Sequence, residues 1–523
     1  MELPDNFASQ FEQIADLAPD RLAVAAGERE LTWARFDELA DRLAAYLAER
    51  GLGADDRVGL AARNSPEYLV ALHALFKLRA TPVNVNYRYR AGEVRHLLES
   101  SGARGVIADE ELVDVVTEAA SGLPAAAVLV TIPFGAEVTA APRHPRRPRG
   151  DAEWLLFTGG TTGYPKAVLG SHTERVRAVR SGGVTTLGID PALGVEALHQ
   201  ALDMDPGCYV HFPASPLMHG TGLYSALGTL AVGSPVVLLP GRSTTGADLV
   251  SAISRHRVTD LTIVGDAFAL RLLDALDAGG TAVVGSLRRI RSVGAVWSPP
   301  VKRRLLEHLD VALMDTIAAS EGGVYATATV TRATPPEHAG TFTLAAGARL
   351  LDLDGRDVEP GSDTVGMLAA PVVADATYEG DADKSADAFR DIDGIRYSIP
   401  GDMARMDVDG RLHLLGRGSS VINTGGEKVY ADEVELVLRD HPAVRDVVVV
   451  GVPDVQWGSA VGAVIALEPR THAEADELAG FVAARLAGYK KPRRIVLVPE
   501  VRRLNTGKAD LRWASAQLIT ELG

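Results

Sequence analysis

The sequence has a single cysteine, Cys208, among its 523 residues. One thiol excludes a disulfide within the chain and a zinc cage built from cysteines, and we expect Cys208 to be a small buried apolar side chain. An excess of basic residues is also missing, because 53 Lys and Arg are outnumbered by 68 Asp and Glu and leave a formal charge of −15. Nucleic-acid-binding proteins show the opposite balance. The sequence therefore predicts no nucleic-acid partner.

The sequence also lacks a long uninterrupted apolar run. The stretch from Leu223 to Pro240 carries no charge, but Gly228, Gly233 and Pro235 interrupt it, whereas a membrane-spanning helix needs about 20 consecutive apolar residues. Residues Met1 to Asp5 have neither the positive charge nor the apolar segment of a signal peptide. We therefore expect a cytoplasmic protein without an integral membrane segment.

The spacing of apolar residues predicts an α/β fold. Strand and helix signals alternate from Leu31 to Ala108 and again from Val236 to Leu276, which is typical of a mostly parallel sheet covered by helices. Beyond Leu344, short strands separated by Asp-Gly pairs predict a small β-rich subdomain. The Pro- and Arg-rich segment from Ala140 to Gly150 is expected to be an irregular surface connection.

The chain is longer than one hydrophobic core supports, so we expect at least two domains. Strand and helix signals from Ala431 to Val498 belong to a tail whose size suits a separate, smaller α+β domain. The predicted boundaries are an N-terminal domain over residues 1–416, a hinge over residues 417–420 and a C-terminal domain over residues 421–523.

One loop is especially rich in glycine and threonine. It runs Thr158-Gly159-Gly160-Thr161-Thr162-Gly163-Tyr164-Pro165-Lys166 and follows an apolar strand that ends at Phe157. Glycines let backbone N–H groups turn toward an anion, threonines add hydroxyl donors and the lysine adds a positive charge, so the loop predicts a polyphosphate site. No Gly-Lys-Ser/Thr closes it, which excludes a Walker-type motor or transport ATPase. Taken alone, its composition also fits an ordinary turn.

Five downstream segments decide between these interpretations by their order and spacing. They are Pro216–Gly222, Ser292–Pro299, Asp315–Gly323, the run from Tyr397 through Arg417 to Glu435, and Arg503–Lys508. With the glycine loop, they resemble the adenylate-forming superfamily over most of the chain, from about Phe11 to Arg512. The pattern is most similar to that of actinobacterial fatty-acyl and steroid-side-chain CoA ligases.

The resemblance implies a set of residues that bind ATP and its product AMP. These residues are Thr158, Gly159, Gly160, Thr161, Thr162, Gly163, Lys166, Gly294, Ala295, Asp315, Thr316, Ser320, Asp402 and Arg417. It also implies that Glu321 holds Mg²⁺, a role that suits a hard carboxylate oxygen. The segment 1–416 is then the AMP-binding domain, and the C-terminal domain is mobile about the hinge at Gly418-Ser419-Ser420.

The resemblance further implies catalytic and acyl-binding residues. Lys508 is expected to bridge the substrate carboxylate and the α-phosphate, and His219 is expected to line or gate the acyl pocket, although a lone histidine is as often structural. The predicted acyl pocket consists of His219, Thr221, Val296, Trp297 and Gly322, of which Trp297 also suits a core position. The predicted channel for the CoA thiol consists of Gly425, Gly426 and Glu427.

The function implied by the resemblance is that of an ATP-dependent carboxylate–CoA ligase. The carboxylate of a small-molecule acid attacks the α-phosphate of Mg·ATP, which gives an acyl-adenylate and pyrophosphate, and the thiol of CoA then displaces AMP. Positive charge from Lys166 and Lys508 stabilises the anions that meet in the first step.

Two alternatives stay open. Ile317 and Ala318 stand where the family carries an aromatic residue and a glycine. This departure favours a member diverted to another acid or acceptor, through carrier-protein loading, amide formation, or nitrite activation for diazotisation. A degenerate binding protein is disfavoured because the catalytic set is complete. The sequence does not specify which acid is activated, and it leaves open whether the protein is a homo-oligomer.

Overall fold

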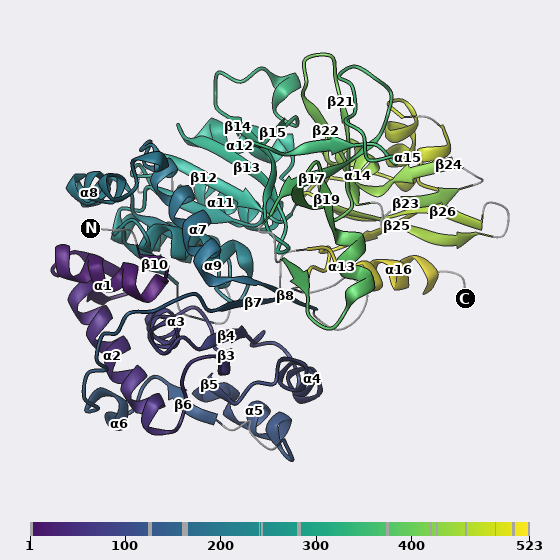
Figure 1. Ribbon diagram of the computed structural model, residues 1–523. Coiled ribbons are helices and arrows are strands. Elements are labelled where there is room, and N and C mark those ends of the chain that lie inside the picture. The colour runs from purple at the N-terminus through teal and green to yellow at the C-terminus, as the bar shows by residue number, and fades with distance from the viewer. Residues whose placement is uncertain are drawn as a thin grey trace. The chain divides into compact units, whose positions relative to one another are not determined.

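The computed structural model describes residues 4–123, 128–158, 166–239, 241, 244–279, 284–295, 297–372, 376–417, 421–424, 427–454, 458–486, 488–504 and 508–520 (Figure 1). The chain divides into two compact units, each described here by itself. The first unit comprises Met1–Ile263, Arg271–Arg291 and Val373–Ala386, and the second comprises Val264–Leu270, Ser292–Val372 and Asp387–Gly523.

One sheet of the first unit is parallel and has four strands in the order β4-β3-β5-β6. Its strands are β3 (Arg57–Ala61), β4 (Thr81–Asn84), β5 (Gly105–Asp109) and β6 (Val128–Ile132). The helices that precede or connect them are α1 (Phe7–Leu17), α2 (Trp33–Glu49), α3 (Pro66–Leu78), α4 (Ala91–Ser101) and α5 (Val113–Ala120), and α6 (Ala136–Thr139) follows β6. The predicted alternation of strands and helices is therefore confirmed.

Helix α2 illustrates how the sequence specifies these elements. The side chain of Thr32 accepts a hydrogen bond from the N–H of Arg35 and thereby caps the first turn. Residues spaced by three or four positions, among them Trp33, Phe36 and Leu43, are fully buried on one face.

A second sheet of the first unit contains the strands in the order β11-β9-β10-β1-β2, parallel except for the β1–β2 pair. These strands are β1 (Leu22–Ala26), β2 (Arg29–Thr32), β9 (His211–Pro213), β10 (Val236–Leu238) and β11 (Asp260–Ile263). A smaller sheet joins β7 (Glu153–Thr158), β8 (Lys166–Ser171) and β18 (Thr377–Tyr378). The accompanying helices are α7 (His172–Thr186), α8 (Val195–Asp203), α9 (Gly220–Leu230), α10 (Gly246–His256) and, from Arg271 onward, α11 (Gly265–Asp277), whose first residues belong to the second unit.

The second unit contains the predicted β-rich subdomain. The antiparallel strands β13 (Ala312–Ala318), β14 (Val324–Val330) and β15 (Thr343–Leu344) follow β12 (Arg289–Val293) and α12 (Pro299–His308). An antiparallel sheet is formed by β16 (Arg349–Leu351), β17 (Gly366–Pro371), β19 (Phe389–Ile392), β20 (Ile395–Ser398), β21 (Asp402–Met406) and β22 (Leu412–Arg417). Helix α13 (Ala382–Ala388), which lies in the first unit up to Ala386, precedes β19 in the chain. Asp393 and Gly394 both have positive φ, as the tight β19–β20 turn requires.

The C-terminal part of the second unit is α+β, as expected. Its elements are β23 (Val421–Thr424), β24 (Glu427–Tyr430), α14 (Ala431–Arg439), β25 (Val444–Asp454), β26 (Gly458–Leu467), α15 (Ala475–Ala483), β27 (Arg494–Val498) and α16 (Leu511–Thr520). One apolar cluster includes residues of α14 and α15, and another includes residues of α16, with alternate residues of β25 and β26 in each. Alternating side chains along a strand point to opposite faces, so both faces of this sheet are covered.

The prediction for Cys208 is wrong. Cys208 is exposed and lies in the short 3-10 turn Pro206–Cys208, in which no residue is buried. Partial desolvation and the nearby Asp205 carboxylate raise the pKa of the thiol. The error arose because burial was inferred from residue type, whereas the Asp-Pro-Gly sequence before Cys208 is a surface turn.

The segment from Ala140 to Gly150 is irregular, as predicted, but it is more than a surface connection. Three of its arginines, Arg143, Arg146 and Arg149, pair with buried acids of α1 and α2. The side chain of Arg149 is only 3% exposed and contacts both carboxylate oxygens of Glu12.

These arginines belong to a buried charge network around Lys77. The Lys77 ammonium lies 2.7 Å from a carboxylate oxygen of each of Glu12, Asp37 and Asp41. Burial alone would raise the pKa of Asp37, but His73 and Lys77 stabilise its charged form and hold that pKa well below its usual range. Burial lowers the pKa of His73, so its ring is neutral at pH 7. The network joins α1, α2 and α3.

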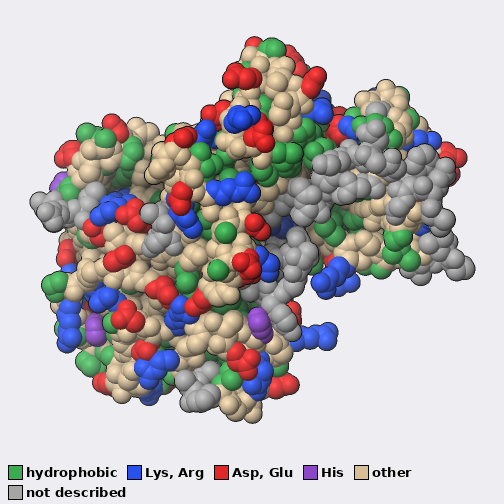
Figure 2. Space-filling model, turned by 45° about the vertical axis from the view of Figure 1, so that its right-hand side comes forward, with side chains coloured by type: hydrophobic (Ala, Val, Ile, Leu, Met, Phe, Trp, Pro, Cys, Tyr) green, Lys and Arg blue, Asp and Glu red, His purple; other side chains and the backbone are tan. Residues whose placement is uncertain are grey.

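None of the helices in the described ranges is both long and apolar enough to cross a membrane. Figure 2 shows acidic and basic side chains interspersed over the face that it presents, which accords with the mixed and mainly acidic composition.

Replacing Lys77 by methionine should lower the free energy of unfolding by about 3–5 kcal/mol, because methionine fills similar space but removes the fully buried cation that contacts all three carboxylates. Urea unfolding followed by tryptophan fluorescence measures the change. Arg35→Met is the control, since the exposed Arg35–Glu38 pair should contribute about 0.5 kcal/mol or less. Similar losses in both variants would contradict the role given to Lys77.

Candidate functional site

The glycine-rich loop connects the two strands of a β-hairpin. Thr158 is the last residue of β7 and pairs with Lys166, the first residue of β8, so the ends of the loop are fixed opposite each other. The predicted phosphate-binding residues Gly159, Gly160, Thr161, Thr162 and Gly163 lie outside the described residues. The described hairpin therefore fixes where the loop begins and ends in the first unit.

Lys166 lies beside the short strand β18. Its ammonium is 4.9 Å from the centroid of the Tyr378 ring and 4.0 Å from Oδ2 of Asp381. The same Asp381 oxygen is 2.9 Å from Lys384, so Asp381 pairs mainly with that residue. One third of the Lys166 side chain is exposed at the mouth of the loop. A cation held in this way can attract an anion bound by the loop.

Asn84 is a residue that the sequence analysis missed. It ends β4, accepts a hydrogen bond from the N–H of Phe157 (2.7 Å) and donates to the carbonyls of Phe157 (2.9 Å) and Met218 (2.8 Å). One side-chain amide thus joins the strand before the glycine loop to the segment before His219. A polar residue at the carboxyl end of an apolar parallel strand was the available signal, since ligand sites form at such ends.

His219 and Thr221 lie at the start of α9, where His219 is the N-cap residue. Both are half-buried. A second asparagine, Asn64, orients the preceding segment by accepting from the N–H of Leu217 (2.7 Å) and donating to the carbonyl of Ser215 (3.1 Å). The first unit therefore brings together the glycine-loop hairpin and the predicted acyl-pocket residues His219 and Thr221 through two asparagines.

In the second unit, Ser320 and Glu321 occupy the turn between β13 and β14. The N–H of Gly322 donates to the carbonyl of Ala319 (3.1 Å) and closes the turn. Gly323 has φ +85°, and an added Cβ would lie 2.7 Å from that of Ala370, so only glycine fits there. Both predicted site residues are half-buried at the tip of this turn.

Tyr325 is a second residue that the sequence analysis missed. Its buried hydroxyl lies 2.7 Å from Oγ of Ser398 and 3.1 Å from the carbonyl oxygen of Gly322. The β13–β14 register passes from Ile317–Ala326 to Ala318–Val324, so Tyr325 is the extra residue of a β-bulge. The unusual Ile317-Ala318 pair therefore lies directly opposite this bulge.

Asp315 and Thr316 lie on β13. The Asp315 carboxylate is buried and lies 2.7 Å from the Lys302 ammonium, which also donates to the carbonyl of Ala339. Burial raises the pKa of Asp315, while Lys302 opposes that shift. The Asp315 side chain is thus paired with Lys302 in the interior of the second unit.

The predicted adenylate turn follows β12. Gly294 has φ +92° and is exposed, Ala295 is half-buried, and Val296 lies outside the described residues. Trp297 is 3% exposed and its ring is 5.5 Å from the Lys302 ammonium, so it occupies a core position. The core alternative for Trp297 is the one that the structure supports.

Asp402 and Arg417 are brought opposite each other, since they pair across β21 and β22. The hinge residues Gly418, Ser419 and Ser420 and the thiol-channel residues Gly425 and Gly426 lie outside the described residues. Glu427 begins β24, and its backbone pairs with Thr424 of β23.

Lys508 lies at the base of a short hairpin. The N–H of Leu504 donates to the carbonyl of Lys508 (2.7 Å), and Arg503 pairs with Ala509. Arg503 also makes a bidentate contact with Asp446 of β25, with distances of 2.9 and 2.5 Å. The position of Lys508 is therefore fixed through the side chain of Arg503.

The residues of the β13–β14 turn fit a magnesium ion. Ser320 and Glu321 offer a hydroxyl and a carboxylate, the hard oxygen donors that Mg²⁺ uses together with phosphate oxygens. Among the described residues, Glu12, Asp37 and Asp41 also lie within metal-binding distance of one another. There the Lys77 ammonium already contacts all three carboxylates.

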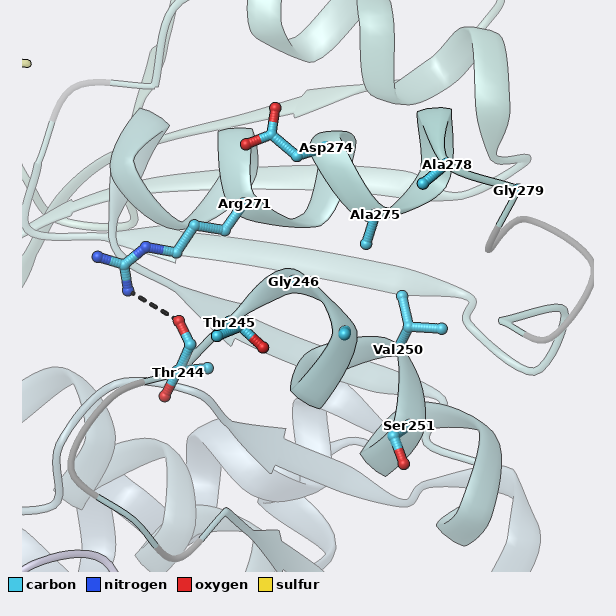
Figure 3. Close-up of a pocket in the computed structure, with 11 residues that line it drawn as sticks. Thr244, Thr245, Gly246, Val250, Ser251, Arg271, Asp274, Ala275, Ala278 and Gly279 are labelled. Carbon is cyan, nitrogen blue, oxygen red and sulfur yellow. Dashed lines mark hydrogen bonds between the residues drawn. The ribbon is translucent and has the colours of Figure 1, made fainter. Parts of the chain in front are cut away.

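A cavity of about 880 Å³ lies between α10 and α11. Figure 3 shows Arg271 of α11 directed to Thr244, whose carbonyl accepts its hydrogen bond at 3.3 Å. Gly246 permits the close approach of the helices, because an added Cβ would lie 2.1 Å from the carbonyl oxygen of Arg271. None of the motif residues lines this cavity.

Comparison with known proteins decides the family. The AMP-binding enzyme family matches residues 11–369, and the AMP-binding enzyme C-terminal domain matches residues 433–508. The chain belongs to the AMP-binding enzyme family. The resemblance to adenylate-forming enzymes is thereby confirmed.

Two full-length relatives specify the reaction class. The chain is 36% identical to the 3-oxocholest-4-en-26-oate–CoA ligase of Rhodococcus rhodochrous, with 98% of this chain and 96% of that protein covered. It is 37% identical, at the same coverage, to the medium/long-chain-fatty-acid–CoA/3-oxocholest-4-en-26-oate–CoA ligase of Mycobacterium tuberculosis. This AMP-binding enzyme is an AMP-forming acid–CoA ligase. Enzymes of this class use ATP with Mg²⁺, and CoA is the co-substrate.

A solved structure supports the fold. The anthranilate CoA ligase AuaEII in complex with anthranoyl-AMP superposes with a TM-score of 0.85 at 22% identity, over 100% of this chain and 99% of that chain. The α/β fold with a smaller C-terminal α+β part is confirmed.

Replacing Tyr325 by phenylalanine should raise the KM for Mg·ATP about fivefold to tenfold, because the lost hydroxyl no longer fixes Gly322 beside Ser320 and Glu321. Acid-dependent pyrophosphate release measures this constant. Tyr209→Phe is the matched control, since it removes another buried tyrosine hydroxyl, which contacts Thr229 in the first unit. An unchanged KM in Tyr325→Phe would contradict the role of the bulge.

Proposed function

We propose that this AMP-binding enzyme activates a large apolar carboxylic acid, a medium- or long-chain fatty acid or a steroid side-chain acid, for transfer to CoA. The observation that carries the proposal is the full-length similarity to two ligases whose names state these acids. The proposed cellular location is the cytoplasm, where ATP and CoA are both available.

The proposed roles in the first unit concern the departing phosphates and the acyl chain. The glycine loop from Gly159 to Gly163 holds the β- and γ-phosphates through its backbone N–H groups, and Lys166 adds positive charge. His219 and Thr221 line the acyl pocket. The hairpin and asparagine contacts described above support this arrangement, because they fix both segments to the same strands.

The proposed roles in the second unit concern AMP and the reacting atoms. Ser320 contacts the α-phosphate, and Glu321 holds Mg²⁺, which supplies positive charge to phosphate oxygens when bound. Asp402 accepts hydrogen bonds from the ribose hydroxyls, and Arg417 lies opposite it. Lys508 bridges the carboxylate and the α-phosphate. The carboxylate oxygen forms the new bond to phosphorus as the bond to pyrophosphate breaks.

The second step proceeds on the acyl-adenylate. The CoA thiol loses its proton and attacks the acyl carbonyl carbon, the C–O bond to AMP breaks, and the thioester forms. We further propose that residues 1–416 and 421–523 act as the AMP-binding and C-terminal domains about a hinge at residues 417–420. The tail then presents Lys508 in one step and the channel of Gly425, Gly426 and Glu427 in the other.

The Ile317-Ala318 departure supports a second candidate, a ligase that uses another acid or acceptor. Ile317 packs against the apolar cluster around Tyr325, and a β-branched side chain covers a base by dispersion without aromatic stacking. This candidate includes carrier-protein loading, amide formation and nitrite activation. It predicts adenylation without CoA thioester formation.

A panel of carboxylic acids should separate the two candidates. With Mg·ATP, acids of medium to long chain and steroid side-chain acids should release pyrophosphate, and added CoA should give the thioester, detected by mass spectrometry. Short acids should react at least about tenfold less efficiently, because each buried methylene contributes about 0.8 kcal/mol to binding. Pyrophosphate release with nitrite but with none of the acids would contradict the proposal, and so would an adenylate that only an amine or a carrier protein accepts.

Replacing Lys508 by alanine should reduce adenylation at least about a hundredfold, because the variant loses the charge that stabilises the meeting anions. Thioester formation from a chemically prepared acyl-adenylate should stay within about threefold of the original rate, since that step does not use the ammonium. Arg512→Ala, at an exposed position of α16, is the control. Full adenylation by Lys508→Ala would refute the assigned role.

A further inference from the structure

Asp266 is a buried acid at the second position of α11, only 4% exposed. Its Oδ1 accepts a hydrogen bond from the N–H of Ser298 (2.9 Å), the N-cap residue of α12. The neighbouring N–H of Gly265 donates to Oγ of Ser292 (2.9 Å). Asp266 is therefore fixed directly behind the turn that starts at Gly294.

Arg439, the last residue of α14, meets this acid. Its side chain is only 5% exposed, and Nη1 lies 3.3 Å from Oδ2 of Asp266 and 3.3 Å from Oδ1 of Asp446. Nη2 lies 3.1 Å from Glu435 and donates to the carbonyl of Val447 (2.9 Å). Burial alone would lower the pKa of Arg439, but the three carboxylates outweigh it and raise that pKa, so the group stays charged.

Asp446 continues the network toward Lys508. Besides Arg439, it pairs with Arg503, which precedes the Leu504–Lys508 hairpin contact by one residue. A continuous path thus begins with the hydrogen bond from Ser298 to Asp266 and continues through ion pairs to Arg439, Asp446 and Arg503. All of these residues belong to the second compact unit.

Only the Asp266–Arg439 contact in this path joins the α11–α12 region to the C-terminal elements. Among the described residues, two partly exposed pairs also join these regions, Arg304 with Glu468 at 3.1 Å and Arg303 with Asp440 at 3.8 Å. Pairs open to solvent contribute little, whereas separation of a buried pair leaves charges without compensation. The buried pair therefore dominates the energetics of this junction.

We infer that Arg439 is a positioning residue, which through its ion pair with Asp266 holds the Lys508 hairpin in a fixed relation to the Gly294–Trp297 turn. The inference rests on the proposed function, in which that turn lies against the adenylate and Lys508 acts in only one of two steps. A pair formed in one arrangement of the C-terminal elements and broken in another biases the enzyme toward the first arrangement. Arg439 thus sets the balance between adenylation and thioester formation.

The test compares the two half-reactions in Asp266→Asn. Asparagine retains an oxygen for the N–H of Ser298 but removes the charge that Arg439 meets. The ratio of the adenylation rate to the rate of thioester formation from a prepared acyl-adenylate should change about fivefold or more. A purely structural role would lower both rates in the same proportion, because it changes only the folded fraction.

Further variants isolate the pair. Arg439→Lys retains the charge and should shift the ratio less than Arg439→Gln does. The double variant Asp266→Asn/Arg439→Gln should shift it no further than Arg439→Gln alone, because both changes remove one contact. Arg304→Gln, which removes the more solvent-exposed pair with Glu468 at the same junction, should leave the ratio unchanged. If Arg439→Gln fails to fold, Asp266→Asn and Arg439→Lys still decide the outcome.

An unchanged ratio in Asp266→Asn, or a ratio that Arg304→Gln shifts equally, would overturn the inference. Failure of the proposed function gives a different result, since the unaltered enzyme would then form no thioester with any acid of the panel. If the unaltered enzyme performs both half-reactions and Asp266→Asn slows both alike, only the positioning role of Arg439 is refuted.

Discussion

A charge removed from water must meet an opposite charge, and three of the buried cations in the described part of the chain show how its arrangement depends on that constraint. Lys77 lies among Glu12, Asp37 and Asp41, Lys302 lies on Asp315, and Arg439 lies between Asp266, Glu435 and Asp446. Lys77 and Arg439 join segments that are distant in the sequence, and Lys302 joins the consecutive elements α12 and β13. Because an uncompensated buried charge is costly, each pair specifies one arrangement of its segments and disfavours others.

The two pairs of the second unit lie next to the residues proposed for catalysis. Lys302 fixes Asp315 on β13, the strand that leads into the turn of Ser320 and Glu321. Asp266 holds Ser298, which follows the turn proposed to lie against the adenylate. In the first unit the neutral amide of Asn84 fixes the strand before the glycine loop by hydrogen bonds to Phe157 and Met218. Rigid neighbours of this kind let catalytic groups act without reorganisation.

Local patterns in the sequence predicted the elements well, because each pattern reflects contacts a few residues apart. The buried stripe of α2 and the Asp-Gly turns follow from helical spacing and from positive φ. The motif residues were found for another reason, since their order resembles a family. Asn84, Tyr325 and Arg439 were not found, because the partners that give them a role lie 73 or more residues away. Arg143 and Arg149 were underestimated for the same reason.

The Ile317-Ala318 pair shows how a departure from a family pattern is accommodated. The residues opposite it are displaced by the bulge, which makes Tyr325 and Ala326 buried in succession instead of alternating. The bulge turns the Tyr325 hydroxyl toward Gly322 and Ser398, so the turn of Ser320 and Glu321 is anchored from β14. Ile317 needs only to pack on the same apolar cluster. The turn of Ser320 and Glu321 is therefore anchored without an aromatic residue at position 317. Under the proposed function, the departure at this position changes how the base is covered while the anchored turn is retained.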